Sequence, residues 1–439
     1  MAKIINPRAA GVDIAAKEHF VCVPHSNPKE MGVVRSFGSY TRDLHDLADW
    51  LQEHKITTVA MESTGIYWTE LYFILKERGF EVLLVDARHI KNVPGRKSDV
   101  LDAQWIQKLH AYGFLRGCFQ PENIVRTLRT LVRRRTKLIQ DMTTSSNRMI
   151  KALEQMNLKT KQVMADIHGK TGQGVINAII RGERNPKNFL QYKDCRIRAT
   201  DADFILALEG NWKPEQLYLL ELENNMYKFL KLQLENLDVK IEETLKEMIK
   251  EKALHEKSVR NIKGKNSPKF QVANYLKSIH GVDVTQIYGL RESGALTILS
   301  ETGTELKKKF PTEKQFLSWL NLVPNNKVSG GKIISSGMKK KKNKAGQAFR
   351  SCASALWRSK NVLGEKLRSK KARKGAGPAI VSIAKTIASI YYHMITTKCE
   401  FDPSKLRENQ NKQLIKKQNY YQRKALEMTL EIEKQRQVI

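Results

Sequence analysis

The feature that most constrains this sequence is a set of four carboxylates within its first hundred or so residues. One interrupts a short apolar segment, one ends a second apolar segment, and two open a segment of helical character: Asp13, Glu62, Asp99 and Asp102. An aspartate inside an apolar strand is costly to bury without a partner. We therefore expect Asp13 to lie beside another charged group, beside a cation, or at the open end of a sheet.

The sequence around these acids predicts an α/β domain. Short β-rich runs and amphipathic segments follow one another in the order strand, strand, strand, helix, strand, helix, strand, helix (residues 9–15, 19–24, 31–37, 40–54, 57–61, 66–78, 80–85 and 99–112). Three consecutive strands favour an antiparallel meander, and the strand–helix–strand units that follow favour parallel pairing.

The four acids together predict a metal site. Asp99 and Asp102 are three residues apart, so they share one face of their helix. Carboxylates this close raise one another's pKa unless a cation neutralises them. Ligands that are all oxygen favour Mg²⁺ or Mn²⁺ over Zn²⁺, and two such ions can drive phosphodiester chemistry. For Asp99 or Asp102 alone, the alternative is an acid that the helix dipole favours in a first turn.

The charge balance indicates a nucleic-acid partner. The chain has 77 Lys and Arg against 45 Asp and Glu, a net charge of +32, and counterion release makes such an excess suited to binding a polyanion. An anionic membrane surface is the weaker alternative, because no strongly apolar helix carries a single basic face. The longest apolar run, 379–395, contains Lys385 and His393 and predicts a core helix rather than a membrane span. Residues 1–10 lack the apolar region of a signal peptide.

A long helix predicted over 122–157 is rich in arginine. At 1.5 Å per residue it would be about 50 Å long. Its apolar positions can pack on the domain while Arg126, Arg129, Arg133 and Arg134 face outward, and we predict that these four contact a phosphate backbone. A solvated basic face is the alternative.

The middle of the chain predicts a coiled coil. Apolar residues recur every three or four positions over 214–254, namely Met226, Leu230, Leu234, Leu237, Ile241, Leu245 and Met248. The sequence leaves open whether this seam pairs within the chain or between two subunits. Residues 257–269 predict a basic linker, and 158–212 receive no predicted site.

A second domain is predicted from residue 270. Residues 276–290 resemble a helix-hairpin-helix, although Asp283 replaces the usual second glycine. Helices are expected at 286–300 and 313–321. Residues 327–374 contain sixteen Lys or Arg and one acid, and apolar helical positions lie between them, which favours a folded nucleic-acid-binding surface. Its predicted contacts include Lys332, Lys339, Lys340 and Arg350.

Within this basic segment, Ser329 precedes two glycines and Lys332. A hydroxyl on such an electropositive turn suits a nucleophile that attacks a phosphate, because glycines allow close approach. Taken alone, a Ser-Gly-Gly sequence is simply a turn.

Five motifs give the sequence a family resemblance. G-V-D-I, M-E-S-T-G-I-Y-W, K-S-D-V-L-D-A, I-H-G-V and L-V-P followed by S-G-G-K resemble the DEDD-type transposases of the insertion-sequence 110 family, relatives of the Piv invertases. The resemblance covers roughly residues 8–155 and 272–358. One departure is Asn321, where the family usually has glycine before L-V-P.

The resemblance implies a fold and a set of parts. It implies an RNase H-like, RuvC-like catalytic domain (1–157), a variable insert with coiled coil and basic linker (158–269), a mainly α-helical C-terminal transposase domain (270–398) and a charged helical tail (399–439). Asp13, Glu62, Asp99 and Asp102 would hold the divalent metal, and Ser329 would form a covalent link to DNA. The implied partners are donor and target DNA, a non-coding "bridge" RNA, and further copies of the chain in a dimer or tetramer. The implied location is the cytoplasm of a bacterium or archaeon, at the nucleoid.

Two other functions stay open at this point. One is a metal-dependent invertase or junction nuclease that uses water and no guide RNA, with Ser329 a bystander. The other is a non-catalytic RNA-binding protein in which the acids have no role. The acids that serve Ser329 could come from the same chain or from another subunit.

Overall fold

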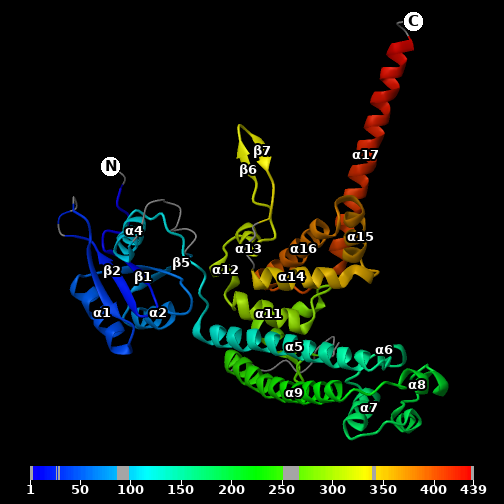
Figure 1. The fold of residues 1–439 in the computed structure, drawn as a ribbon. Coiled ribbons are helices and arrows are strands. Elements are labelled where there is room, and N and C mark those ends of the chain that lie inside the picture. The colour runs from blue at the N-terminus through cyan, green and yellow to red at the C-terminus, as the bar shows by residue number, and fades with distance from the viewer. Residues whose placement is uncertain are drawn as a thin grey trace. The chain divides into compact units, whose positions relative to one another are not determined.

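The computed structural model describes residues 3–25, 27, 30–86, 98–250, 266–338 and 343–436. The chain divides into two compact units, Met1–Gln120 and Pro121–Ile439. Figure 1 shows the elements of both units. The basic linker predicted at 257–269 lies largely outside the described residues, as do Lys339 and Lys340.

The first unit contains a five-stranded sheet. Its described elements are β1 (Ala9–Ile14), β2 (Glu18–Val23), β3 (Val33–Gly38), α1 (Thr41–Glu53), β4 (Thr58–Glu62), α2 (Trp68–Glu77), β5 (Glu81–Val85) and α4 (Asp99–Ala111). The strand order is β3-β2-β1-β4-β5. β1, β2 and β3 pair antiparallel, whereas β1 with β4 and β4 with β5 pair parallel. The predicted meander and the predicted parallel units are both confirmed.

The two faces of this sheet bury different helices (Figure 1). On one face Val12 and Met61 join α1 and α2 in the main apolar core. On the other face Ala60 packs with Ile106 of α4. Because side chains alternate along a strand, Gly11 and Asp13 share the face that α4 covers.

Gly11 sets how closely α4 approaches the sheet. A Cβ atom at this position would lie 2.2 Å from the backbone N of Gln107 and 2.6 Å from the backbone O of Ala103. Both contacts are with helix backbone, which cannot rotate out of the way. Only glycine therefore allows α4 to lie this close to β1.

Replacement of Gly11 by alanine is expected to loosen α4 from the sheet. Overpacking of this kind costs about 1–3 kcal/mol of stability. Amide hydrogen exchange in β1 and α4 of the full chain should therefore become faster. Gly377→Ala is the matched control, because nothing lies within 4 Å of a Cβ there. Unchanged exchange in the Gly11 variant would contradict this account of the packing.

The second unit is mostly helical. Its described elements are α5 (Asn123–Gln155), α6 (Thr160–Val163), α7 (Lys170–Ile180), η1 (Pro186–Tyr192), α8 (Asp201–Ala207), α9 (Pro214–Ile249), α10 (Val272–His280), η2 (Val284–Gln286), α11 (Glu292–Thr302), α12 (Leu306–Lys309), α13 (Glu313–Trp319), β6 (Lys327–Ser329), β7 (Lys332–Ser335), α14 (Lys344–Ala355), η3 (Leu356–Arg358), α15 (Val362–Lys374), α16 (Ala376–Thr397) and α17 (Pro403–Arg436).

The long helices α5 and α9 lie side by side along most of their length (Figure 1). Arg135 pairs with Asp238 and Arg148 with Glu223, so the two helices run antiparallel. The Arg135–Asp238 pair is buried, and Arg135 also donates to the backbone O of Asn266. The partner of α9 that the sequence left open is therefore a helix of the same chain.

Helix α5 was predicted as part of the acidic domain, but its apolar face packs within the second unit. Leu128 and Val132 join a core with α9 and α11, and Leu138 joins a core with the small helices α6 to α8. Periodicity shows that a helix has an apolar face, but not which element covers it. For the same reason the buried face of α9 differs in part from the predicted apolar seam. Met226 was predicted to be in the seam but is 46% exposed, and the neighbouring Tyr227 is buried.

The helical body of the second unit is built around α16. Tyr391 of this helix is fully buried, which confirms the predicted core helix. The helix expected to begin at residue 286 begins only at Glu292. Gly289 has a φ of +84°, which is not a helical conformation, so the backbone cannot be helical through that residue. Asn321 has a φ of +55°, a left-handed conformation that asparagine tolerates better than most residues.

The tail forms the single helix α17, as predicted. In the part of the chain that the structure describes, no helix is long and apolar enough to cross a membrane.

Candidate active site

Asp13 and Glu62 come from neighbouring parallel strands. Val12 of β1 is paired with Met61 of β4, so the residues that follow, Asp13 and Glu62, are neighbours at the same end of the sheet. Both lie on the face that α4 covers. Asp13 is half-buried, and the Glu62 side chain is buried and accepts a hydrogen bond of 2.6 Å from the Thr64 hydroxyl.

Helix α4 supplies the other two acids. Ser98 caps the helix by accepting a hydrogen bond from the backbone N–H of Leu101. Asp99 and Asp102 follow in the first turn, where Asp99 is exposed and Asp102 is half-buried. Since α4 packs against β1, this turn lies on the same side of the sheet as Asp13.

The four carboxylates act on one another electrostatically. The pKa of Asp13 is raised from 3.8 to about 6, first by burial and then by repulsion from Glu62, Asp102 and Asp99. All three of the other acids thus contribute to the field at Asp13. The structure brings together the four residues that the sequence singled out, on three different elements of one unit.

The donor chemistry of this acidic site suits a hard divalent cation, because every candidate ligand is a carboxylate oxygen. Among the described residues, no group of three or more His, Cys, Asp or Glu side chains is arranged so that it could hold a metal ion. The carboxylates interact through space but do not form a closed coordination shell.

Ser329 lies at the tip of an exposed hairpin. It ends β6 and pairs with Lys332 at the start of β7, with Gly330 and Gly331 between them at φ values of +53° and +74°. Two positive φ angles in a two-residue loop are typical of a type I′ turn. The predicted turn is therefore present, and it places the serine beside a lysine. Within the described chain, no side chain forms a hydrogen bond to the Ser329 hydroxyl.

The base of the hairpin is closed by a hydrogen bond of 2.7 Å from the backbone N–H of Asn325 to the backbone O of Gly337. Every residue of both strands is exposed, including Val328, Ile333 and Ile334. Figure 1 shows the hairpin projecting from the helices of its unit. The serine is thus held in a defined local geometry and stays accessible from outside the unit.

The predicted nucleic-acid contacts fall into different environments. Arg133 forms a two-pronged ion pair with Glu301, at 2.7 and 2.8 Å. Arg129 donates to the backbone O of Ser300 and of Glu301, at 3.1 and 2.8 Å. These two arginines attach α5 to α11. No pattern in the sequence indicates this role, because Glu301 is far from both arginines in the chain.

The other predicted contacts also differ in exposure. Arg350 donates to the backbone O of Asn321 at 2.6 Å and is half-buried, as is Arg126. Arg134 and Lys332 are exposed. These last two have the accessibility that a contact with a phosphate backbone needs.

The predicted helix-hairpin-helix turn is formed between α10 and η2. Gly281 caps α10 with a φ of +76°. The backbone N–H of Asp283, which the motif would offer to a phosphate, donates instead to the Glu400 carboxylate at 3.2 Å. The Asp283 side chain accepts from the backbone N–H of Thr285. The turn exists, but in this structure its N–H group is already bonded within the chain.

Two family models match the chain. One, described as a transposase and of the DEDD, IS110 type, matches residues 10–158, and one for the IS116/IS110/IS902 family of transposases matches residues 277–366. The matches together cover more than half of the chain and contain all four acids and Ser329. The chain belongs to the IS110 family of transposases. No curated protein sequence matches it.

Membership of this family identifies the class of enzyme. The protein is a DNA transposase or recombinase of a mobile element. The two matches fall on the acidic site and on the region of the serine hairpin, respectively. Helices α6 to α9, most of α15, and all of α16 and α17 lie outside them.

Proposed function

We propose that this transposase exchanges DNA strands under the guidance of an RNA, using a carboxylate-bound metal and Ser329 as the nucleophile. The observation that carries the proposal is the placement of Asp13 and Glu62 at the same end of the sheet, on the face covered by the helix that carries Asp99 and Asp102. Burial, and then repulsion from these three acids, raises the pKa of Asp13. Four acids that repel one another across three elements are unfavourable unless a cation or a reacting phosphate group uses them.

The topology supports an RNase H-like, RuvC-like assignment for the first unit. The strand order β3-β2-β1-β4-β5, with an antiparallel meander followed by parallel strands, is the arrangement that the family resemblance implies. The acids lie at the end of the central strands and on the helix that covers one face. The antiparallel pair α5 and α9 supports the proposed coiled coil.

Asp13, Glu62, Asp99 and Asp102 would hold Mg²⁺ or Mn²⁺, which would supply positive charge to a scissile phosphate and to the leaving oxygen. Burial of Glu62 and Asp13 excludes part of the water that would screen this charge. The hydrogen bond from Thr64 fixes one oxygen of Glu62 and leaves the other available.

Ser329 would perform a transesterification. Its Oγ forms a bond to the phosphorus while the bond from phosphorus to the 3′ oxygen breaks. The serine loses a proton and the 3′ oxygen gains one, so no oxidant or reductant is needed. The energy of the phosphodiester is kept in the serine–DNA link, which a 3′ hydroxyl of the second strand can then attack. Exchange between two duplexes needs several such serines, which supports a dimer or tetramer.

A hydrolytic nuclease or invertase remains the second candidate. The observation that favours it is the Ser329 hydroxyl, to which no described side chain offers a hydrogen bond that would activate it. In that case water would attack the phosphate and no protein–DNA adduct would form.

The proposed guide RNA is tested by identifying the RNA that copurifies with the protein. We expect the transposase, expressed together with its native flanking DNA and purified, to carry one discrete RNA encoded beside its gene. Loops of that RNA should match the element's ends and its target. The large excess of Lys and Arg supports binding of such a polyanion. Recovery of only heterogeneous cellular RNA would contradict the guided mechanism and favour the unguided invertase.

A further inference from the structure

A hollow lies where α15 turns back into α16. The two helices are joined by the single residue Gly375, whose φ is +81°. The hollow has a volume of about 340 Å³ and is lined by Lys370, Arg373, Lys374, Pro378, Ala379 and Ser382. All of its lining residues lie beyond the part of the chain that the family models match.

The sequence around this hollow carries positive charge alone. Residues 366–385 contain seven Lys or Arg and no Asp or Glu, namely Lys366, Arg368, Lys370, Lys371, Arg373, Lys374 and Lys385. Two of the seven are engaged elsewhere. Arg368 donates to the backbone O of Ser359, and Lys371 lies over the Trp357 ring at 3.8 Å. The other five supply the remaining positive charge, and one of them, Arg373, also donates to the Ser369 hydroxyl at 3.0 Å.

These five cations have no neutralising partner nearby. In the part of the chain that the structure describes, none of them forms an ion pair with a carboxylate. Lys370 is held at the hollow by a hydrogen bond from its Nζ to the Ser382 hydroxyl. Its pKa is lowered by burial and then by repulsion from Lys374, Lys366, Arg373 and Lys385. A solvated basic face ordinarily lets its side chains spread apart, whereas here Lys370 is half-buried among like charges.

We propose that the α15–α16 hollow binds phosphate groups of a nucleic-acid backbone, with Lys370, Arg373 and Lys374 as the contacting residues.

The spacing of the lysines favours a polymer over a free phosphate ion. Lys366, Lys370 and Lys374 recur at every fourth position, so they form a row about 12 Å long on one side of α15. A row of this length exceeds one phosphate group and can follow several consecutive phosphates of a strand. The first turn of α16, which lines the same hollow, adds the positive end of a helix dipole.

This inference rests on the proposed function only in taking nucleic acid as the ligand. It does not depend on Ser329, on the acids or on a metal. A binding measurement without divalent cation therefore separates its failure from failure of the proposed chemistry.

The test is the salt dependence of binding by the full chain. We would measure the affinity for a labelled DNA duplex, and separately for a single-stranded RNA of equal length, by fluorescence anisotropy at several salt concentrations. Lys370→Gln/Lys374→Gln should lower the steepness of log K against log [salt] by about 2 for duplex DNA, or about 1.4 for single-stranded RNA, because each lost phosphate contact removes about 0.9 or 0.7. Arg373→Gln/Lys374→Gln is the second variant, and both of its side chains are exposed.

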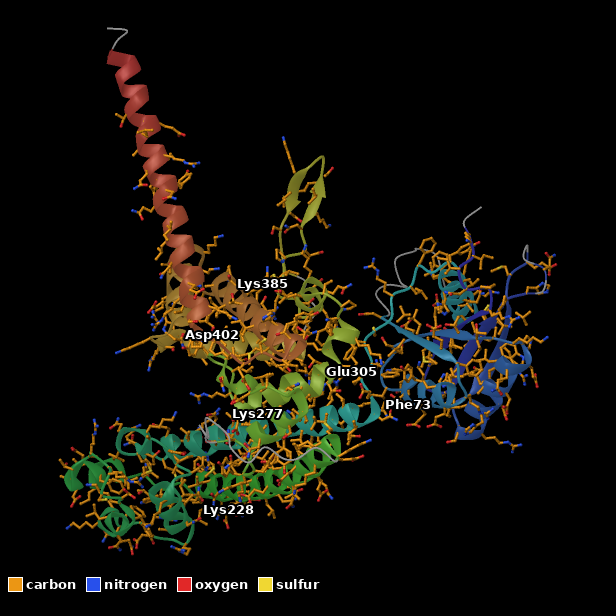
Figure 2. All side chains as sticks on the ribbon, turned by 180° about the vertical axis from the view of Figure 1, so that it is seen from behind. Phe73, Lys228, Lys277, Glu305, Lys385 and Asp402 are labelled. Carbon is orange, nitrogen blue, oxygen red and sulfur yellow. The ribbon has the colours of Figure 1, made fainter. Side chains whose placement is uncertain are left out.

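The control removes the same charge elsewhere in the second unit. Lys228→Gln/Lys231→Gln changes two exposed lysines of α9. Figure 2 labels Lys228 on that helix and Lys385 on α16, on opposite sides of the unit. A change in slope confined to the α15 variants supports the site, and the nucleic acid for which it occurs identifies the ligand as DNA, RNA or both. Slopes equal to those of the wild type or of the α9 control, with both nucleic acids, would overturn the proposal.

Discussion

Ser329→Ala is expected to abolish strand exchange while leaving nucleic-acid binding intact. Loss of the only atom that forms the covalent link should lower the rate by about a thousandfold or more. The hairpin should survive the change, because Ser329 contributes backbone pairing to Lys332 and its turn is set by Gly330 and Gly331. The measurement is recombination of a donor and a target plasmid, with affinity measured in parallel.

Ser335→Ala is the matched control, since Ser335 is an exposed serine of the same hairpin, paired with Lys327. It should keep full activity. The wild-type chain should also yield a denaturation-resistant adduct with labelled DNA, in which mass spectrometry places the DNA on the peptide containing Ser329. An adduct on another residue, or full activity of the alanine variant, would remove Ser329 from the mechanism and favour hydrolysis by water.

Asp13→Asn is expected to have opposite effects on activity and on stability. Replacement of one charged oxygen of the acidic site should lower the rate of metal-dependent strand cleavage by about a thousandfold. A bound metal stabilises the charge of the transition state by several kcal/mol, and the loss of a ligand weakens that stabilisation. Without metal, the same change removes a carboxylate that is half-buried beside three others. The variant should then be more stable than the wild type at neutral pH, by about 1 kcal/mol once solvent screening is allowed for.

The stability difference has a defined pH dependence. The raised pKa of Asp13 means that the folded state binds a proton more tightly than the unfolded state. In the metal-free wild type, this group therefore lowers the free energy of unfolding as pH rises from about 4 to about 6, and the loss persists above pH 6. The asparagine variant should lack that decrease, and added Mg²⁺ should raise the melting temperature of the wild type more than that of the variant.

Asp46→Asn provides the comparison, because Asp46 is an exposed acid of α1, and α1 packs on the face of the sheet opposite to the one that holds Asp13. It should keep both the activity and the pH dependence. Full activity of the Asp13 variant, or identical pH profiles for the wild type and that variant, would argue against a shared metal site.

Much of the first unit follows from its sequence. The strands and helices are short and strongly patterned, so alternation places Gly11 and Asp13 on one face and Val12 on the other. Parallel pairing of β1 with β4 then brings Asp13 beside Glu62. The acidic site was predictable because each acid lies at or near the end of a strand or helix. The start and end of these elements follow from residues close to them in the sequence.

The second unit was less predictable, and the reason is distance along the chain. Arg129 and Arg133 read as free cations in sequence, yet they bind Glu301, which lies about 170 residues later. Met226 fits the apolar repeat of α9 but is exposed. An amphipathic pattern fixes the period of a helix, whereas its exact rotation depends on the partner.

The sequence by itself determined the elements, the four acids, the serine turn and the family. Only the tertiary structure decided that α5 packs against α9 and α11 and that the Glu400 carboxylate accepts a hydrogen bond from the backbone N–H of Asp283. It also decided that Lys370 and Lys374 of α15 line a hollow beside α16. The physical reason is that backbone dihedrals, turns and apolar periodicity are set by neighbouring residues. The pairing or isolation of a charge is set by whichever segments the packed core brings together.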